Sequence, residues 1–334
     1  MSKKWGMFSI LFYLFALVLS GCTTTSPFDS TNQAAQEQTG EPSAQAPKSV
    51  DPGKQIVIGV SVNALSNIHN QEMYDYTEQA IKAAGFKPVM VNANGLAVQQ
   101  VSDIENLIQQ NVDVIIIQNG DTDALKNVVK SAVDKGIHVI SMDSGWIPGV
   151  SALFAKNDFE VGSSIYSMLA AEMGFEGEVI TINHNDHPAI RARRNVQDAV
   201  LKEYANIKRV ANVTSGFPGT VELAYKGVES SLQAHPNVKA IWATFDLEAV
   251  GAAQAVKAAG RDDIIIAGVD GEKEALQFIK EGGPIIATVV ADMKTASEQV
   301  VQVAEKLARG EQTNKFYPIP YNIVTKENVD QYLQ

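Results

Sequence analysis

The chain has a single cysteine, Cys22, among its 334 residues, and therefore no disulfide bond can form within it. Basic residues are also in short supply, since 27 Lys and Arg stand against 38 Asp and Glu, a formal net charge of −11. Proteins that bind nucleic acid use clustered Lys and Arg to neutralise phosphates, so this charge argues against a nucleic-acid partner. An acidic balance of this size chiefly keeps a protein soluble.

Short motifs of common enzymes are absent as well. The sequence contains no Gly-x-Ser-x-Gly nucleophile elbow, no Walker-type phosphate loop and no Gly-x-Gly-x-x-Gly turn after a predicted strand. His184 and His187 have a spacing seen in metal sites, but Pro188 follows and no third ligand is evident, which favours a solvated loop. These absences predict a protein that is not an enzyme and has no metal or cofactor.

The first 22 residues have the pattern of a bacterial export signal. Lys3 and Lys4 precede an apolar run over residues 7–19, which is too short to cross a membrane comfortably as a mature helix. The run ends in Leu19-Ser20-Gly21-Cys22, which resembles a lipobox, the signal that is cut before a cysteine whose thiol is then lipidated. We therefore predict a signal peptide over residues 1–21 and a lipid on Cys22. An ordinary secretory signal and an uncleaved anchor are the alternatives.

Residues 22–53 are rich in Thr, Ser, Gln, Ala and Pro and show no apolar period, which predicts a flexible tether. From Gln55 onward, aliphatic runs alternate with helical patterns through the rest of the chain. Continuous Ile and Val runs such as residues 264–266 are typical of strands buried on both faces of a parallel sheet. Two series of such units predict an α/β fold with two doubly wound parallel-sheet lobes.

The stretch over residues 241–271 shows this unit most clearly. Its pattern predicts a strand, a helix ending at Gly260 and a second strand, with Asp246 and Asp270 just after the two strands. Ligands of open parallel sheets bind outside the carboxyl ends of the strands, so both carboxylates are expected to face a ligand crevice.

This stretch resembles the ribose/galactose-binding type of periplasmic binding protein, the type I family of bacterial sugar ABC transporters. The shared elements are Asp246, Ala249-Val250-Gly251-Ala252, Ala259-Gly260, the strand over 264–266 and Gly268-Val269-Asp270-Gly271. The resemblance extends from about Lys54 to about Thr325. It implies that the chain passes back and forth between the lobes: residues 54–156 plus 292–320 form lobe 1, and residues 157–291 plus 321–334 form lobe 2. It also implies a hinge of three segments near Lys156, Ala291 and Pro320, with the ligand between the lobes.

Candidate ligand-binding residues come from two sources. Asp143, Asp246 and Asp270 follow predicted strands, although a lone aspartate at such a place is more often a helix cap or a solvated turn, and Asp246 fits a cap as well. The resemblance favours ligand contact for Asp143 and Asp270. It further implies that Arg191 or Arg193 binds the sugar and that Phe217 stacks on it. The full set that we predict is Asn63, Asn67, Gln118, Asp143, Arg191, Arg193, Phe217, Phe245, Asp246 and Asp270.

Several positions depart from the ribose binders of the family. His69 and Asn70 stand where those proteins have two aromatic residues, Phe245 stands in place of an asparagine, and Ala291 in place of a glutamine. A different pentose, a hexose, a furanose or a polyol therefore fits as well as ribose.

The resulting hypothesis is a monomeric, lipid-anchored binding protein on the outer side of the cell membrane. It would capture a monosaccharide or polyol and deliver it to an ABC permease. The alternative is a sensor component that presents the bound sugar to a membrane histidine kinase or chemoreceptor. LacI-type repressors share the core, but the export signal and the lack of a DNA-binding helix pair before Lys54 exclude that function.

Overall fold

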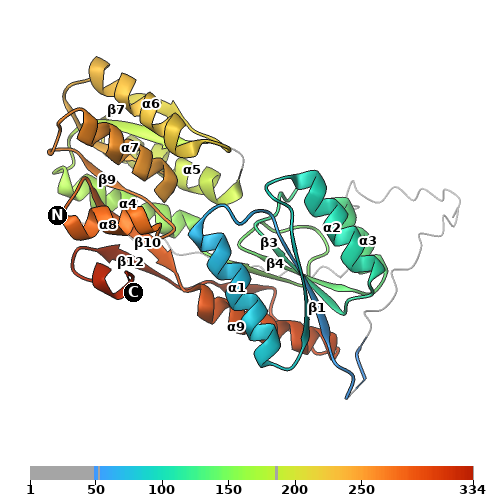
Figure 1. Cartoon of the computed structure of the whole chain (residues 1–334). Coiled ribbons are helices and arrows are strands. Elements are labelled where there is room, and N and C mark those ends of the chain that lie inside the picture. The colour runs from blue at the N-terminus through green and yellow to red at the C-terminus, as the bar shows by residue number, and fades with distance from the viewer. Residues whose placement is uncertain (1–48, 52, 185–186, 334) are drawn as a thin grey trace, which may run out of the picture. The chain divides into compact units, whose positions relative to one another are not determined.

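The computed structural model describes residues 49–51, 53–184 and 187–333, which form two α/β units with one six-stranded sheet each (Figure 1). The predicted signal peptide, Cys22 and most of the predicted tether lie outside the described residues. No helix in the described part of the chain is long and apolar enough to cross a membrane.

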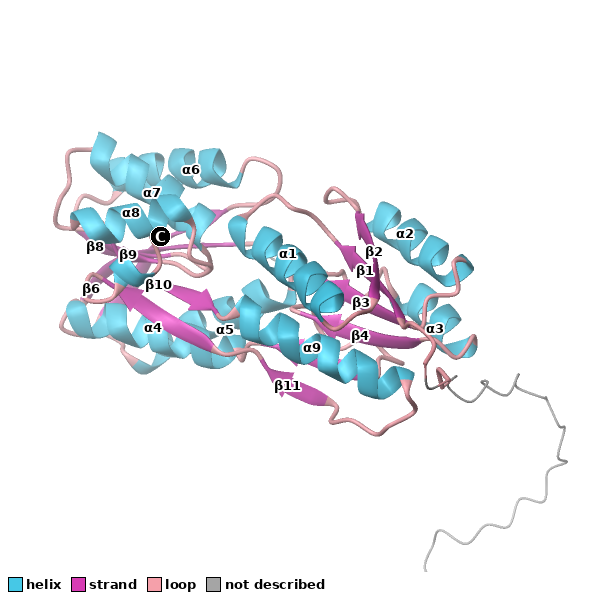
Figure 2. Ribbon diagram, turned by 60° about the horizontal axis from the view of Figure 1, so that its bottom comes forward, coloured by secondary structure: helices cyan, strands magenta, loops and turns pink. Residues whose placement is uncertain are grey.

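The first sheet consists of six parallel strands in the order β2-β1-β3-β4-β5-β11. Helices α1 and α9 lie side by side over one face of this sheet (Figures 1 and 2), and α2 and α3 cover the other face. A separate apolar core fills each side. The elements are β1 (Val57–Val62), α1 (Ile68–Ala83), β2 (Lys87–Asn92), α2 (Ala97–Gln109), β3 (Val114–Gln118), α3 (Lys126–Asp134), β4 (His138–Met142), β5 (Ala152–Ala155), α9 (Met293–Ala308) and β11 (Phe316–Pro318).

The second sheet repeats this arrangement in the order β7-β6-β8-β9-β10-β12. Helices α6, α7 and α8 share one core with it, and α4 and α5 share another. The elements are α4 (Asp158–Glu172), β6 (Gly177–Asn183), α5 (Pro188–Glu203), β7 (Ile207–Thr214), α6 (Thr220–Ala234), β8 (Val238–Trp242), α7 (Asp246–Ala258), β9 (Ile265–Ala267), α8 (Lys273–Glu281), β10 (Ile285–Ala291) and β12 (Tyr321–Thr325), followed by a 3₁₀ turn at Val329–Gln331.

The prediction of two doubly wound lobes is confirmed, with two differences in detail. Strand β12 pairs antiparallel with β10, so the second sheet is mixed at its edge. Helix α8 was missed by the sequence analysis because it is short and follows directly on the Gly268–Gly271 turn. The chain crosses between the sheets three times: between β5 and β6, between β10 and β11, and between β11 and β12. The predicted bounds of the lobes and the hinge remain predictions.

Gly251 explains one of the small-residue motifs found in the sequence. It lies on α7 where α6 passes close by, and a Cβ atom at this position would approach the carbonyl oxygen of Val221 to 2.3 Å. Only glycine permits this approach of the two helices. The packing of α6 against α7 in turn fixes where α7 begins, next to the carboxyl end of β8.

Candidate ligand-binding site

Both sheets have the strand order 2-1-3-4-5-6 when the strands of each sheet are counted from its first. In such a sheet the order reverses beside the first strand, and the loops after the strands on either side of that point form a crevice at the carboxyl ends. The switch points lie between β1 and β3 in the first sheet and between β6 and β8 in the second. The polar residues described next all follow these strands or their neighbours.

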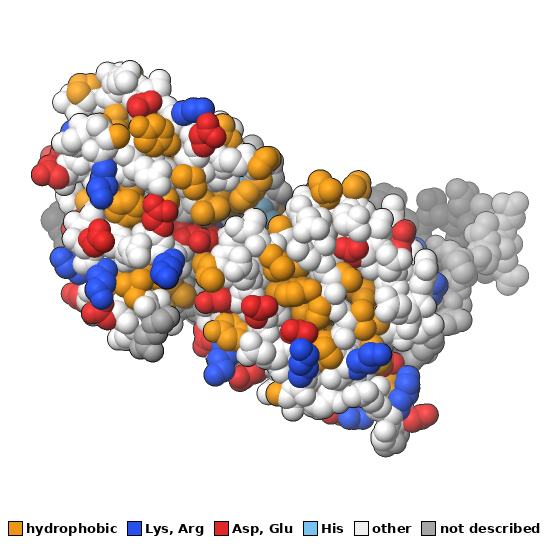
Figure 3. Space-filling model, viewed as in Figure 1, with side chains coloured by type: hydrophobic (Ala, Val, Ile, Leu, Met, Phe, Trp, Pro, Cys, Tyr) orange, Lys and Arg blue, Asp and Glu red, His pale blue; other side chains and the backbone are white. Residues whose placement is uncertain are grey.

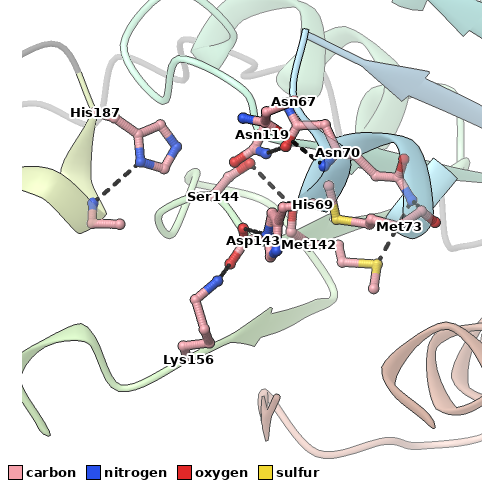
Figure 4. Close-up of polar contacts among 12 residues, drawn as sticks. Asn67, His69, Asn70, Met73, Asn119, Met142, Asp143, Ser144, Lys156 and His187 are labelled. Atoms are coloured by element: carbon pink, nitrogen blue, oxygen red, sulfur yellow. Dashed lines mark hydrogen bonds and ion pairs between the residues drawn. The ribbon is translucent and has the colours of Figure 1, made fainter. Parts of the chain in front are cut away.

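Asp143, directly after β4, lies at the centre of a buried ion cluster (Figure 4). The Lys156 ammonium donates to Asp143 Oδ1 at 2.7 Å, and His69 Nε2 lies 2.6 Å from Asp143 Oδ2. The three side chains are 9%, 2% and 5% exposed for Asp143, Lys156 and His69. Buried charges are tolerated only when they are paired and hydrogen-bonded. In this cluster Lys156 and His69 are the partners of the Asp143 carboxylate.

The charges around Asp143 determine whether its carboxyl group is ionised. Burial alone would raise the pKa of Asp143, but the neighbouring charges of Lys156 and His69 and their hydrogen bonds hold it well below its usual range. Asp143 is therefore a carboxylate at physiological pH. Its backbone is in the left-handed region, with φ of 51°, which aspartate tolerates better than most residues.

Amide side chains surround the N-terminus of α1. Asn67 is the N-cap of this helix, and its Oδ1 accepts from the backbone N–H of Asn70 at 2.8 Å. The Asn70 amide group donates to the carbonyl oxygen of Ala64 and accepts a hydrogen bond from the Asn119 side chain (Figure 4). Asn63 Oδ1 is buried and has no hydrogen-bond partner among the described residues. Asn63 thus offers an acceptor to a ligand, whereas the Asn67 side chain is engaged as a helix cap.

Arg193, on α5, is buried in the second unit. Its guanidinium donates twice to Asp158 Oδ1, at 3.0 and 2.7 Å, and once to the carbonyl oxygen of Thr244 at 2.9 Å. Burial would lower the pKa of Arg193, but Asp158 and Asp270 raise it above its ordinary value. Arg191 is exposed on the same helix. Of the two arginines predicted as alternatives, Arg193 has the geometry of a site residue.

Asp270 is the carboxylate with the most freedom to bind a ligand. It follows β9, is partly buried, and no hydrogen bond or ion pair of its carboxylate involves a described residue, although it lies close enough to Arg193 to raise the pKa of that group. Its backbone has φ of 121°, which side chains other than glycine rarely adopt. Backbone strain of this kind is concentrated at functional sites. At Asp270 it orients a carboxylate that accepts no hydrogen bond from the described residues.

An aromatic cluster lies at the same end of the second sheet. Phe217, 51% exposed, packs with its ring 5.7 Å from that of Phe245, and the ring of His184 meets both nearly edge-on. Phe245 is 3% exposed. Phe217 is therefore available to stack on a ligand, and Phe245 packs against it from the buried side. Ligand contact by either residue remains a prediction.

Two predicted site residues have structural roles. Gln118 is fully buried, and its amide group donates to Thr77 Oγ1 and the Met73 carbonyl of α1. Asp246 is also fully buried, and its carboxyl group does not cap α7. It accepts instead from the backbone N–H groups of Gly271 and Glu272 and from Thr288 Oγ1, each at 2.8 Å. Gln118 is the last residue of β3 and Asp246 the first of α7, and both side chains turn into the packing.

His187 is a residue that the sequence analysis dismissed. It is the N-cap of α5, and its Nδ1 accepts from the backbone N–H of Ala189 at 3.3 Å. Burial lowers the pKa of His187 to about 4, so the ring is neutral near pH 7 and carries its proton on Nε2. Nε2 is buried without a partner among the described residues. The charges of Asp143 and Lys156 in the first unit and of Arg193 and Asp158 in the second all influence the pKa of His187, after the larger effect of burial.

The sequence analysis also did not predict Lys156, His69 and Asp158 as site residues. His69 appeared only as a departure from a family pattern, and Lys156 only as a hinge position. A signal was present in the sequence, because Lys156 and Asp158 follow β5 just as Asp143 follows β4. The pairing that gives them a role depends on the fold and not on the spacing along the chain.

These groups define a class of protein. Neutral hydrogen-bond donors and acceptors, a carboxylate on each unit and an exposed aromatic ring converge on the carboxyl ends of two sheets, and no group of three or more His, Cys, Asp or Glu in the described residues is arranged to hold a metal ion. On the face drawn in Figure 3, acidic and basic side chains are interspersed and form no basic stripe of the kind that binds nucleic acid. The fold and site are those of a two-lobed solute-binding protein.

The comparison with known proteins gives the family. A model of the periplasmic binding protein domain matches residues 58–312, and the chain belongs to this family. The ribose import binding protein RbsB of Bacillus subtilis is 27% identical over 96% of this chain and 98% of its own length. A xylitol-binding protein of Mycolicibacterium smegmatis is 28% identical over 82% of this chain and 78% of its own length. The family consists of binding proteins and not of enzymes, and these two relatives are named as binding proteins for ribose and xylitol.

Solved structures agree with this assignment. An ABC transporter solute-binding protein from Bacillus halodurans with bound myo-inositol superposes with a TM-score of 0.77 and 28% identity, covering 85% of this chain and 99% of its own. An ABC sugar transporter subunit from Rhodobacter sphaeroides has a TM-score of 0.76 and 27% identity, covering 82% and 99%.

The environment of Asp246 predicts a pH-dependent stability. Burial and the nearby Asp270 raise the pKa of Asp246 to about 8. Between about pH 4 and pH 8 the folded protein therefore keeps a proton that the unfolded chain has lost, and the free energy of unfolding falls as the pH rises. Asp246→Asn does not ionise and keeps an acceptor for Gly271 and Glu272.

Urea unfolding at several pH values measures this effect. We expect the free energy of unfolding of Asp246→Asn, relative to wild type, to increase from pH 4 to pH 8 by on the order of a few kcal/mol. A difference that stays constant over this range would contradict the proposed protonation of Asp246.

Proposed function

We propose that this protein binds a monosaccharide or a sugar-like polyol between its two lobes and delivers it to an ABC permease. The observation that carries the proposal is that the carboxyl ends of both sheets present buried polar groups, with Asp143 directly after β4, and with His187 as the N-cap of α5 and Arg193 on that helix. A ligand at that place would touch both lobes at once. One further contact already joins the two, because the backbone N–H of Ile68 at the start of α1 donates to Glu272 Oε1 at 3.2 Å.

The chemistry of the site suits a neutral polyhydroxylated ligand. Asp143 and Asp270 accept hydrogen bonds from hydroxyl groups, while Arg193 and the Nε2–H of His187 supply donors to ligand oxygen atoms. Hydrogen bonds to charged groups are worth about 1.5–3 kcal/mol each, so a few of them hold a small polyol tightly. Phe217 adds an apolar surface for the C–H face of a sugar ring.

Delivery and anchoring complete the proposal. Relatives of this chain are named as import binding proteins for ribose and D-apiose, which favours an importer as the partner. The lipobox-like segment ending at Cys22 favours a lipid anchor on the outer side of the cell membrane, and each buried acyl methylene contributes about 0.8 kcal/mol to such anchoring. The protein would act there as a monomer. The alternative of a sensor component gains no support from the comparisons.

The site prediction is tested with Asp270→Asn. Asparagine keeps the shape of the side chain and tolerates a positive φ, but it replaces one acceptor oxygen by a donor. A thermal-shift screen of wild type against monosaccharides and polyols first identifies a ligand, since a ligand at 100 times its Kd adds about 2.7 kcal/mol of stability. We expect Asp270→Asn to bind that ligand about tenfold more weakly or worse by calorimetry, because one charged hydrogen bond is lost.

The matched control is Asp262→Asn, which makes the same change at an exposed position on the same lobe and should bind like wild type. Normal affinity in Asp270→Asn would move the site elsewhere, and a complete screen without a ligand would contradict the function itself.

Anchoring is tested separately with Cys22→Ala in a bacterial host that processes lipoproteins. Without the thiol there is no lipid to retain the protein, so we expect an unprocessed precursor or a protein released from the membrane. The sugar affinity should not change. Cell fractionation and the mass of the mature N-terminus measure the outcome, and a cleaved Ala variant that stays with the membrane would refute the lipid anchor.

A further inference from the structure

Lys156 combines deep burial with a position where the chain changes lobes. It directly follows β5 and precedes α4, whose packing is with the second sheet. Its side chain is 2% exposed, and its ammonium donates to Asp143 Oδ1. His69, on α1, approaches the other carboxylate oxygen. Three separate elements thus meet at one carboxylate.

The two partners occupy only part of what that carboxylate can accept. An ionised carboxylate has about four acceptor positions, two on each oxygen. Lys156 takes one position on Oδ1, and His69 takes one on Oδ2. No other hydrogen bond to the Asp143 side chain comes from the described residues, so one acceptor position on each oxygen is left. Lys156 and His69 bind different oxygens of the same carboxylate and so hold it in a single orientation.

We propose that Lys156 and His69 are the positioning residues of the ligand site, holding Asp143 ionised and in one orientation so that it accepts hydrogen bonds from the hydroxyl groups of a neutral ligand. This inference rests on the proposed function, since it assigns the positioning of that same site. A sugar acid or a sugar phosphate places negative charge against Asp143 and is disfavoured, because the Lys156 ammonium is already paired and buried.

The same arrangement sets the protonation of Asp143. The charged or titratable groups that act with it are Lys156 after β5, His69 on α1 and His187 at the start of α5. Burial works to protonate Asp143, and Lys156 is the strongest opposing influence. Lys156→Met keeps the length of the side chain and removes its charge, so Asp143 should take up a proton at a higher pH than in the wild type. Lys156→Arg keeps the charge and should restore the wild-type behaviour.

Two measurements on the full-length mature protein test the inference. Carbon-13 NMR of aspartate-labelled protein without ligand follows the Asp143 carboxyl between pH 4 and pH 8, with Asp143→Asn used to assign its signal. Calorimetry at pH 7.5 and pH 5 measures the affinity for D-ribose, xylitol and myo-inositol and for galacturonate as the acidic comparison. Lys294→Met makes the same chemical change at an exposed position of α9 and serves as the matched control.

We expect Asp143 to stay ionised throughout in wild type, in Lys156→Arg and in Lys294→Met, and to titrate at higher pH in Lys156→Met. The affinity of Lys156→Met for whichever neutral compound wild type binds should fall about tenfold at pH 7.5 and further at pH 5, while wild type changes little. A role confined to stability would lower the melting temperature without altering the pH profile.

Unchanged titration and affinity in Lys156→Met overturn the inference, as does tighter binding of galacturonate than of the neutral compounds by wild type. If Lys156→Met does not fold, His69→Gln is measured in the same way and is expected to shift both readouts in the same direction. Failure of wild type to bind any compound contradicts the proposed function, and the titration of Asp143 still decides whether Lys156 holds it ionised.

Discussion

The site depends on a buried carboxylate that stays ionised. Asp143 is removed from water, and a charge in that position is tolerated only because Lys156 and His69 surround it. Losing one partner would leave a charge in the interior without compensation, which costs several kcal/mol and is far more than an exposed ion pair contributes. The cluster also joins α1, the end of β4 and the residue after β5, so the first lobe is tied together at the place where the ligand is expected.

The repeated strand order explains how the rest of the site reaches the same place. Each sheet reverses its order beside its first strand, and each reversal opens a crevice at the carboxyl ends. Asp143 comes from one such edge, and Arg193, Phe217 and Asp270 come from the other. The chain passes between the sheets three times, and we predict that these short segments form the hinge. One of these segments begins at Lys156, so the ion cluster and the crossing share a residue.

The sequence was sufficient for the fold because the fold depends on periodic patterns. Continuous aliphatic runs such as residues 264–266 predicted the parallel strands, and Gly260 marked a helix end. Helix α8 was not predicted, because a nine-residue helix beside a glycine-rich turn shows too few periodic apolar positions.

The site was only partly predictable, for a different reason. Asp143 and Asp270 were predicted because they follow strands, and Asp246 was predicted for the same reason. The Asp246 side chain, however, binds the backbone N–H groups of Gly271 and Glu272 and the hydroxyl group of Thr288. The direction of a side chain is set by neighbours that are distant in sequence. Lys156 and His69 are 87 positions apart, and no spacing rule brings them to the same carboxylate. His187 was set aside as part of a solvated loop, because Pro188 follows it and no third metal ligand was evident, whereas it is in fact the buried N-cap of α5.

The central claim is that one ligand bridges the two lobes, with Asp143 on one side and Asp270 on the other. Small-angle X-ray scattering of the mature protein, with and without a saturating sugar or polyol found by screening, tests it most directly. If the ligand binds both lobes at once, it stabilises the closed arrangement over the open one, and the radius of gyration should decrease when it is added. A radius of gyration that is the same with and without saturating ligand would contradict the bridging site and the delivery mechanism built on it.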